Sequence, residues 1–164
     1  YAIERGKVIS YDPNYRPLLW PDEEMAVRWM KKGLAYADIV KMSEEEMALL
    51  TGRDDLKEGA EAIRNMGPER VLITRGGKGA FYYVDESDNG AVPGFPVRAV
   101  DTTGCGDAFM GSVLYQVLYA ENRSLAEMVR YANAVGALCA TKRGGLPAMP
   151  YHAEVRELLS KYLR

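Results

Sequence analysis

Short β-type runs alternate with helical patterns along most of this chain of 164 residues. Each run has the length and the apolar, β-branched character of a strand, and the helical patterns between them are amphipathic. Strands are predicted at 7–11, 38–41, 71–74 and 80–84, and a run at 97–100 is expected to end as a strand before a glycine-rich turn. Helices are predicted at 21–37, 43–51, 57–66, from about 106, at 125–139 and at 152–162. This alternation favours an α/β layered fold with a largely parallel central sheet.

Two serines mark helix starts by the same spacing. Ser43 with Glu46, and Ser124 with Glu127, form the S-x-x-E pattern of a capping box. In the helix from about 106, apolar residues repeat at intervals of four, which predicts a buried face. Its two rows are Phe109, Val113 and Val117, and Met110, Leu114 and Leu118.

Charge and composition exclude several function classes. The 23 acidic and 21 basic residues nearly balance, so we expect neither a nucleic-acid partner nor attraction to an anionic membrane. No apolar run is long enough for a bilayer span and no signal-peptide pattern is present, which predicts a cytoplasmic protein. Cys105 and Cys139 have no metal-type spacing and are expected to be reduced thiols. The single histidine, His152, is expected on the surface at a helix start, which excludes chemistry that needs paired histidines.

The run Asp101–Asp107 is the most informative segment. Its glycines, Gly104 and Gly106, let backbone N–H groups converge before a helix whose dipole also favours an anion. Asp107 follows in the first helical turn, where a carboxylate could accept the proton of an alcohol during phosphoryl transfer. An acid in the first turn and glycines before a helix are also ordinary structural chemistry. From the residues alone, both interpretations stand.

Other phosphate-binding patterns are absent from the sequence. The chain has no G-x-x-x-x-G-K-[ST] run, and Phe109 stands where a G-x-G-x-x-G fingerprint requires its third glycine. The protein-kinase motifs H-R-D and D-F-G are missing too. P-loop, dinucleotide and protein-kinase sites are therefore disfavoured.

The run DTTGCGDAF at 101–109 resembles the C-terminal signature of the PfkB-type, ribokinase-like carbohydrate kinases. Four further segments, 11–16, 19–21, 37–46 and 132–137, are similar to the fructokinases of that family. The resemblance covers essentially the whole chain. It implies a ribokinase-like three-layer α/β/α sandwich, of which residues 1–164 are the C-terminal, nucleotide-binding half.

The resemblance also implies a reaction and its cofactors. The family transfers the γ-phosphate of ATP to a sugar hydroxyl with Mg²⁺, so Asp107 would be the base and the amides of Gly104, Cys105 and Gly106 the anion hole. The resemblance implies ATP contacts for Thr74, Gly76, Gly79, Thr102 and Asn133, the last of these near the adenine. It implies that Glu46 helps to organise magnesium, and that Asp101, Thr103 and the 142–144 backbone border a monovalent cation. Asn14 and Arg16 would make contacts on the sugar or phosphate side of the site.

Some positions depart from the family pattern or allow two interpretations. Cys105 replaces the usual alanine but keeps its amide, and Ala148 replaces a small polar residue, which leaves activation by K⁺ open. Ser43 stands where many relatives have asparagine. Glu46 can serve the capping box, a metal, or both. Arg75 can contact a phosphate or remain solvated.

The family's domain is about twice as long as this chain, which we expect to begin just before the mid-domain strand that ends at Asp12. The other half supplies most sugar contacts, the hinge glycines and a β-lid through which relatives dimerise. The isolated segment is therefore expected to be inactive and to pair with that half or with itself. Within the family, 2-keto-3-deoxygluconate kinase or another sugar kinase is the alternative. From another class, the alternative is a non-catalytic module that binds a nucleotide or a partner.

Overall fold

A computed structural model describes residues 1–119 and 123–162 of the chain. They form two compact units: one comprises Tyr1–Arg75 and Phe81–Gly90, the other Gly76–Ala80 and the described residues from Ala91 onward. The strands make a five-stranded sheet in the order β1-β2-β3-β4-β5. Their bounds are β1 Ser10–Tyr11, β2 Ile39–Ser43, β3 Arg70–Thr74, β4 Ala80–Tyr83 and β5 Asn89–Val92.

The first unit is built from parallel strands joined by helices. β1 pairs in parallel with β2, and β2 with β3 along its whole length, from Ile39 opposite Arg70 to Ser43 opposite Thr74. The connections are α1 Glu23–Leu34 between β1 and β2, and α2 Glu44–Thr51 followed by α3 Leu56–Arg64 between β2 and β3. Parallel neighbours need such crossovers, so the predicted strand and helix alternation is confirmed here.

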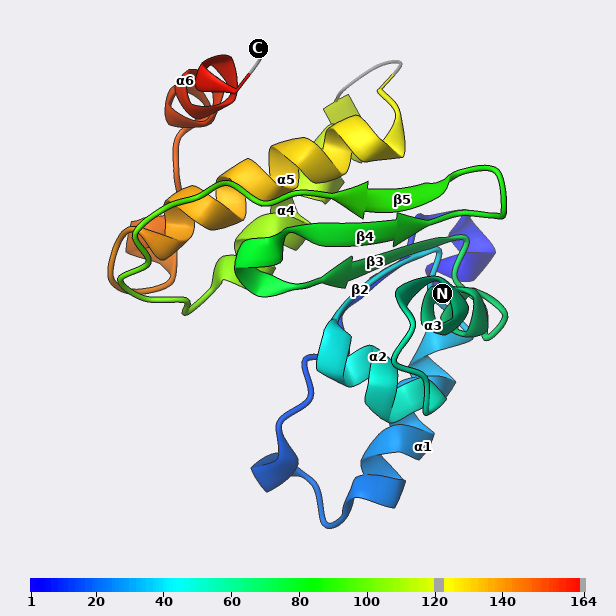
Figure 1. The fold of residues 1–164 in the computed structure, drawn as a ribbon. Helices are drawn as coiled ribbons and strands as arrows, with labels where there is room; N and C mark the ends of the chain where they lie inside the picture. Colours follow the sequence, from blue (N-terminus) through cyan, green and yellow to red (C-terminus); the bar gives the residue numbers. More distant parts are fainter. Residues whose placement is uncertain (120–122, 163–164) are drawn as a thin grey trace. The chain divides into compact units, whose positions relative to one another are not determined.

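The sheet is mixed rather than parallel throughout. The arrows of β3, β4 and β5 point in alternating directions (Figure 1), and the Val84 amide donates to the Asp88 carbonyl at the turn between β4 and β5. Sequence analysis predicted no strand between 80–84 and 97–100, so β5 was missed. Its residues, Asn89–Val92, include a glycine and an asparagine, which are weak strand formers.

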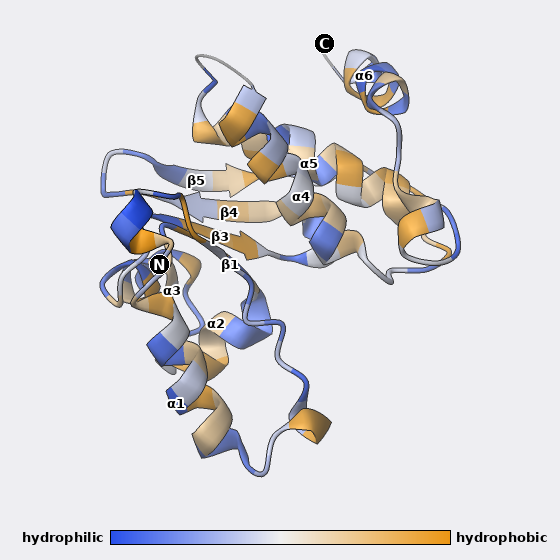
Figure 2. Ribbon diagram, turned by 180° about the vertical axis from the view of Figure 1, so that it is seen from behind, coloured by the Kyte–Doolittle hydropathy of each residue, from blue (hydrophilic) through white to orange (hydrophobic). Residues whose placement is uncertain are grey.

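The core of the first unit surrounds β2 and β3. Both strands are buried almost continuously instead of at alternate positions, as expected for parallel strands covered on both faces. The apolar centre of β3 is orange in Figure 2. The large apolar side chains of this cluster that are less than 2% exposed are Met30, Leu34, Val40, Met42, Met47, Leu50, Ile63, Val71 and Ile73.

The second unit contains α4 Cys105–Tyr119, α5 Leu125–Ala140 and α6 His152–Lys161. α4 and α5 lie side by side (Figure 1), and α6 packs on α5. The predicted apolar rows of α4 are buried at Phe109, Met110 and Val113, as expected. Farther along, Gln116 is only 1% exposed whereas Leu118 is 70% exposed, so the polar residue occupies the interior.

Gln116 is buried because its amide has partners on both sides. Its Nε2 donates to the Ser112 and Met128 carbonyls at 3.3 and 3.0 Å, and its Oε1 accepts from Arg123 Nη1 at 2.9 Å. A buried amide is tolerated when it is hydrogen-bonded in this way. The side chain thereby links α4 to α5 at a position that apolar periodicity does not mark.

The expected strand at 97–100 is not formed. The Val100 and Asp101 amides instead both donate to the Ala140 carbonyl, at 2.7 and 3.2 Å, at the end of α5. Pro93 and Pro96 lack the N–H that a ladder requires, which explains why β-type residues here do not pair as a strand. The segment is an extended lead into the glycine-rich turn.

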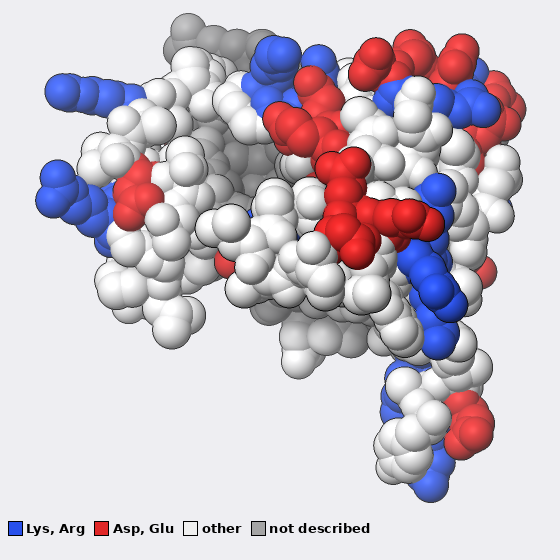
Figure 3. All heavy atoms as spheres, turned by 90° about the horizontal axis from the view of Figure 1, so that it is seen from below, with Lys and Arg blue, Asp and Glu red and all other residues white. Residues whose placement is uncertain are grey.

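Further sequence predictions concern His152, the two cysteines, the surface charge and membrane-spanning segments. His152 begins α6 with an exposed side chain, as predicted, and its Nδ1 lies 2.8 Å from the Tyr131 hydroxyl. Cys105 and Cys139 are free thiols. Acidic and basic side chains share the face seen in Figure 3. No helix in the described part of the chain is long and apolar enough to cross a membrane.

Both predicted capping boxes are present, and the one at α5 permits a direct test. The Ser124 hydroxyl accepts from the Glu127 amide, and the Glu127 carboxylate accepts from the Ser124 amide. Ser124→Ala should lower the free energy of unfolding by about 1 kcal/mol, because one orphan N–H of the helix loses its acceptor. Chemical denaturation measures this. Ser160→Ala, at an exposed serine inside α6, should stay within about 0.5 kcal/mol. Equal effects of the two substitutions would contradict the capping assignment.

Candidate functional site

The carboxyl ends of β1, β2 and β3 lie at one edge of the first unit. Parallel pairing requires this, because Tyr11, Ser43 and Thr74 end neighbouring strands that run in the same direction. Ligands of open α/β sheets bind outside such carboxyl ends. The loop after β1 carries Asn14 and Arg16, both exposed. This edge thus gathers four of the predicted site residues: Asn14, Arg16, Glu46 and Thr74.

The loop 12–16 is held at its start by Asp12. Its Oδ1 accepts from the Asn14 amide at 3.1 Å, and its Oδ2 accepts from Lys41 Nζ at 2.7 Å. Asn14 has a φ of 45°, the left-handed region that side chains other than glycine seldom adopt. A short asparagine tolerates that conformation, which turns the chain sharply between β1 and Arg16.

Glu46 holds the end of the same loop. Its Oε1 accepts from the Tyr15 amide at 2.6 Å, and its Oε2 accepts from the Ser43 amide at 2.7 Å. The Ser43 hydroxyl accepts in return from the Glu46 amide at 3.1 Å, which completes the capping box of α2. The capping role of Glu46 is therefore formed in the structure, and any role near a metal would be additional to it.

Arg75, for which the sequence allowed a phosphate contact or a solvated side chain, has a protein partner in the structure, and the phosphate contact stays a prediction. Its Nε lies 2.5 Å from Glu44 Oε2, in an ion pair whose side chains are 24% and 34% exposed. Thr74, the residue before it, donates from Oγ1 to the Met42 carbonyl at 3.2 Å. Both side chains at the end of β3 thus have partners on or directly after β2.

In the second unit, Asp101–Asp107 form a tight turn into α4. Gly104 has a φ of 77°, and a Cβ there would lie 3.2 Å from the Gly145 Cα, so glycine suits both the conformation and the approach. The first N–H groups of α4, which begins at Cys105, have no acceptor within the helix. Asp107 is exposed in that first turn. The turn has the form of an anion site with a carboxylate beside it.

One member of the expected anion hole is already engaged. The Cys105 amide donates to the Thr102 carbonyl at 3.2 Å, as part of the turn itself. Its thiol is partly buried, and this desolvation, followed by the neighbouring Cys139, raises the pKa of Cys105 to about 12. The thiol is therefore protonated at neutral pH and packs against the apolar core of the second unit. The anion hole itself stays a prediction.

Asp101 ties this turn to the loop after α5. Its Oδ1 accepts from the Thr103 amide and its Oδ2 from the Gly144 amide, each at 2.9 Å. The Gly144 N–H, followed by the Thr103 N–H, lowers the pKa of Asp101 from 3.8 to about 2. The structure thereby brings together the three positions expected to border a monovalent cation. Among the residues described, no group of three or more His, Cys, Asp or Glu could hold a metal ion.

Four residues expected at the nucleotide lie in the second unit: Gly76, Gly79, Thr102 and Asn133. Gly79 has a φ of 97°, and a Cβ there would lie 2.2 Å from the Val92 carbonyl oxygen. Asn133 is 7% exposed, and its Nδ2 donates to the carbonyls of Val92 and Pro93 at 3.0 and 3.2 Å. Asn133 thus fixes the strand end against which the glycine turn packs.

Sequence analysis assigned no role to four of the residues that hold these loops. Lys41 and Asp12 were noted only as parts of predicted strands and of segments similar to fructokinases, and Val92 and Pro93 carried no signal. A lysine inside an apolar run, as in Ile39–Val40–Lys41–Met42, could have drawn attention, because lysine is seldom buried without a partner.

A family model described as pfkB family carbohydrate kinase matches residues 1–151. The chain belongs to this family. Fructokinase-1 of Zea mays is 40% identical over 98% of this chain and 51% of its own length, and Fructokinase-1 of Oryza sativa subsp. japonica is 39% identical over 96% and 50%. The chain therefore spans about half the length of the curated relatives it matches.

Solved structures agree with this assignment. Fructokinase from Vibrio cholerae O395, in a form with fructose, ADP and calcium ion bound, matches with a TM-score of 0.88 at 34% identity, over 96% of this chain and 52% of that one. Aminoimidazole riboside kinase from Salmonella enterica matches with a TM-score of 0.85 at 30% identity, over 96% and 54%. The predicted α/β fold of the ribokinase-like kinases is confirmed.

Gly79 and Gly77 form a matched pair for a test of the glycine turn. Gly79→Ala should lower the free energy of unfolding by about 2–5 kcal/mol, because the new methyl group meets backbone atoms and the positive φ is strained. Gly77→Ala has open space around its Cβ and should change stability by less than about 1 kcal/mol. Urea denaturation of both variants measures the difference. Similar values would mean that the turn tolerates a side chain at Gly79.

The Asp101 contacts predict a pH-dependent stability. Because the folded pKa lies below the unfolded one, the contribution of Asp101 is complete above about pH 4 and is lost as the pH falls through about 2. Asp101→Asn should therefore lower Tm by a few degrees at neutral pH, and this deficit should shrink in acid. Thermal unfolding across that range measures it. Asp54→Asn, at an exposed carboxylate, is the control. A deficit that stays constant with pH would contradict the assignment.

Proposed function

We propose that this chain forms the nucleotide-binding half of an ATP-dependent kinase that phosphorylates a monosaccharide, with fructose as the sugar. The support for a sugar kinase is membership of the pfkB family. The support for fructose is the 40% identity to Fructokinase-1 of Zea mays and the likeness to the fructose-bound Vibrio cholerae structure. Because the matched relatives are about twice as long, the activity belongs to the whole protein.

The observation that carries this proposal is the placement of Asp107 in the first turn of α4, directly after Gly104 and Gly106. The Asp107 carboxylate accepts the proton of the attacking sugar hydroxyl and orients its oxygen. The N–H groups of the turn and the positive end of α4 stabilise the charge on the phosphoryl group in transit. No partner among the described residues occupies the Asp107 carboxylate, which leaves it available for the hydroxyl.

The residues of both units suit ATP and Mg²⁺. Gly76 and Gly79 form a close backbone turn of the kind that lies along phosphates, with Thr74, Thr102 and Asn133 as further nucleotide contacts. Mg²⁺ commonly uses only one or two carboxylates together with the phosphates, and Glu46 would help to organise such an ion. When bound, the ion neutralises charge on the phosphates. Asp101 and Thr103 would border a monovalent cation.

The partners follow from the same proposal. The substrates are a monosaccharide and ATP, and the other half of the domain or a second copy of the kinase completes the assembly, in the cytoplasm. Among other sugar kinases, an enzyme acting on 2-keto-3-deoxygluconate or on a riboside differs in the residues that contact the sugar. A panel of sugars offered to the full-length kinase decides between them, and binding of ATP without turnover of any sugar would support a non-catalytic module.

Asp107→Asn tests the base in the full-length kinase. Removing the proton acceptor should lower kcat by about 10²–10⁴-fold, while the Kd for ATP, measured by calorimetry, should change by less than about twofold. Glu24→Gln is a suitable control, because Glu24 is also an exposed carboxylate in a first helical turn, that of α1. It should leave kcat unchanged. Near-normal turnover by the Asn variant would show that Asp107 is not the base.

A further inference from the structure

Lys41 is a buried cation that none of the assigned roles uses. It lies on β2 between Val40 and Met42, which are fully buried, and its own side chain is 8% exposed. Its Nζ lies 2.7 Å from Asp12 Oδ2, and the Asp12 side chain is 20% exposed. A buried ion pair is weak evidence for a contribution to stability, because desolvation offsets much of the attraction. The location of the Lys41–Asp12 pair is therefore more informative about its role than the strength of the pair.

The partner of Lys41 is the residue at which β1 becomes a loop. Asp12 uses its second oxygen to accept from the Asn14 amide at 3.1 Å, which shapes the turn. At the other end, Glu46 accepts from the Tyr15 amide at 2.6 Å. Between these two anchors lies Asn14, with its φ of 45° and an exposed side chain. The strained residue is thus held from both sides by carboxylates, and only one of these carboxylates has a lysine partner.

We propose that Lys41 is a positioning residue for the loop 12–16, which we call the substrate loop. By fixing Asp12, it holds Asn14 and Arg16 in the geometry that receives the sugar. This rests on the proposed function and on the family resemblance, which implies that both side chains contact the sugar or phosphate side of the site. Lys41 itself does not touch the substrate, because its side chain is buried beneath the loop against Asp12. Its role is to keep a left-handed turn populated when no ligand is present, so that binding needs little rearrangement.

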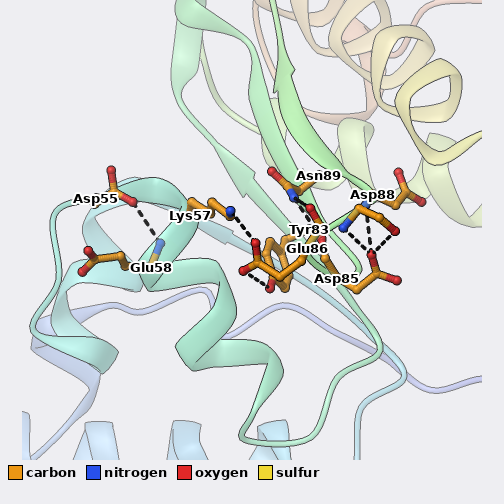
Figure 4. A network of polar contacts seen from close by, with 9 residues as sticks. Asp55, Lys57, Glu58, Tyr83, Asp85, Glu86, Asp88 and Asn89 are labelled. Atoms are coloured by element: carbon orange, nitrogen blue, oxygen red, sulfur yellow. Dashed lines mark hydrogen bonds and ion pairs between the residues drawn. The ribbon is translucent and has the colours of Figure 1, made fainter.

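The same unit contains a matched control. Lys57 Nζ lies 2.6 Å from Glu86 Oε2, a distance close to that of the Lys41 pair, but its side chains are 47% and 68% exposed (Figure 4). The Lys57–Glu86 pair links α3 to the turn after β4, and neither residue lies at the carboxyl ends of β1, β2 and β3. Lys57→Met therefore removes an ion pair of similar length without reaching the substrate loop.

Hydrogen exchange, followed by mass spectrometry on the full-length kinase without ligands, tests the positioning directly. Lys41→Met leaves Asp12 without its counter-charge, so exchange of the Asn14 and Tyr15 amides should accelerate by at least about tenfold. Exchange in the segment 56–64 should stay unchanged. Lys57→Met should leave 12–16 unchanged. Equal protection of 12–16 in the wild type and in Lys41→Met would overturn the proposal, whatever the enzyme turns out to phosphorylate.

Kinetics with the same variants test the consequence. Lys41→Met should raise the KM for the sugar by at least about tenfold and change the Kd for ATP by less than about twofold, because only the substrate loop is released. Lys41→Arg, which restores the charge, should recover most of the sugar affinity. A rise in KM shared equally by Lys57→Met, or an equal loss for sugar and ATP, would overturn the proposal.

A double variant separates positioning from stability. In Lys41→Met/Asp12→Asn no buried charge is left unpaired, so thermal stability should return toward the wild-type value while the KM for the sugar stays high. If thermal stability and the KM for the sugar both returned to wild-type values, the pair would be merely structural, and the proposal would be overturned. If the wild-type kinase phosphorylates no sugar, the proposed function fails, and the exchange experiment still decides whether Lys41 positions the loop.

Discussion

The parallel pairing of β2 with β3 is the constraint on which the first unit depends. Residue by residue, from Ile39 opposite Arg70 to Ser43 opposite Thr74, it aligns the ends of two strands that are separated by two helices in the chain. β1 joins the same alignment through Tyr11 opposite Val40. A shift of one residue would turn every side chain of β2 to the other face, and would move Lys41 away from Asp12. The buried apolar run of the strands thus determines where the polar residues of the edge lie.

Carboxylates at this edge and in the glycine-rich turn mostly bind the protein's own backbone. Asp12 and Glu46 hold the loop 12–16, and Asp101 joins Thr103 to Gly144. Charge-assisted bonds of this kind are stronger than neutral ones and fix loops that lack regular structure. Among the described residues, the Asp107 carboxylate differs from those of Asp12, Glu46 and Asp101 because no backbone N–H donates to it. In the proposed mechanism, this carboxylate is the base.

Much of this arrangement could be predicted from the sequence, because it follows from local rules. Apolar runs, capping boxes and the glycine-rich turn each depend on residues close together in the chain, and most strands and helices lie where these signals put them. The exceptions depend on distant partners. Gln116 is buried because the Met128 carbonyl on α5 accepts from its amide, and Val100 bonds Ala140 instead of a strand. Periodicity carries no information about such contacts, and the Lys41 pair escaped notice for the same reason.

The two loops expected at the nucleotide and at the sugar are held by different physical means. The turn at Gly79 packs backbone against backbone, at Val92 and Gly94, with the Asn133 amide fixing the opposing segment. Any side chain added at Gly79 would meet backbone atoms of this segment. The loop at Asn14 is held by charged groups: Asp12 pairs with Lys41, and Glu46 accepts from the Tyr15 amide. Buried pairs are screened little by salt, which keeps this second kind of loop ordered at ordinary ionic strength.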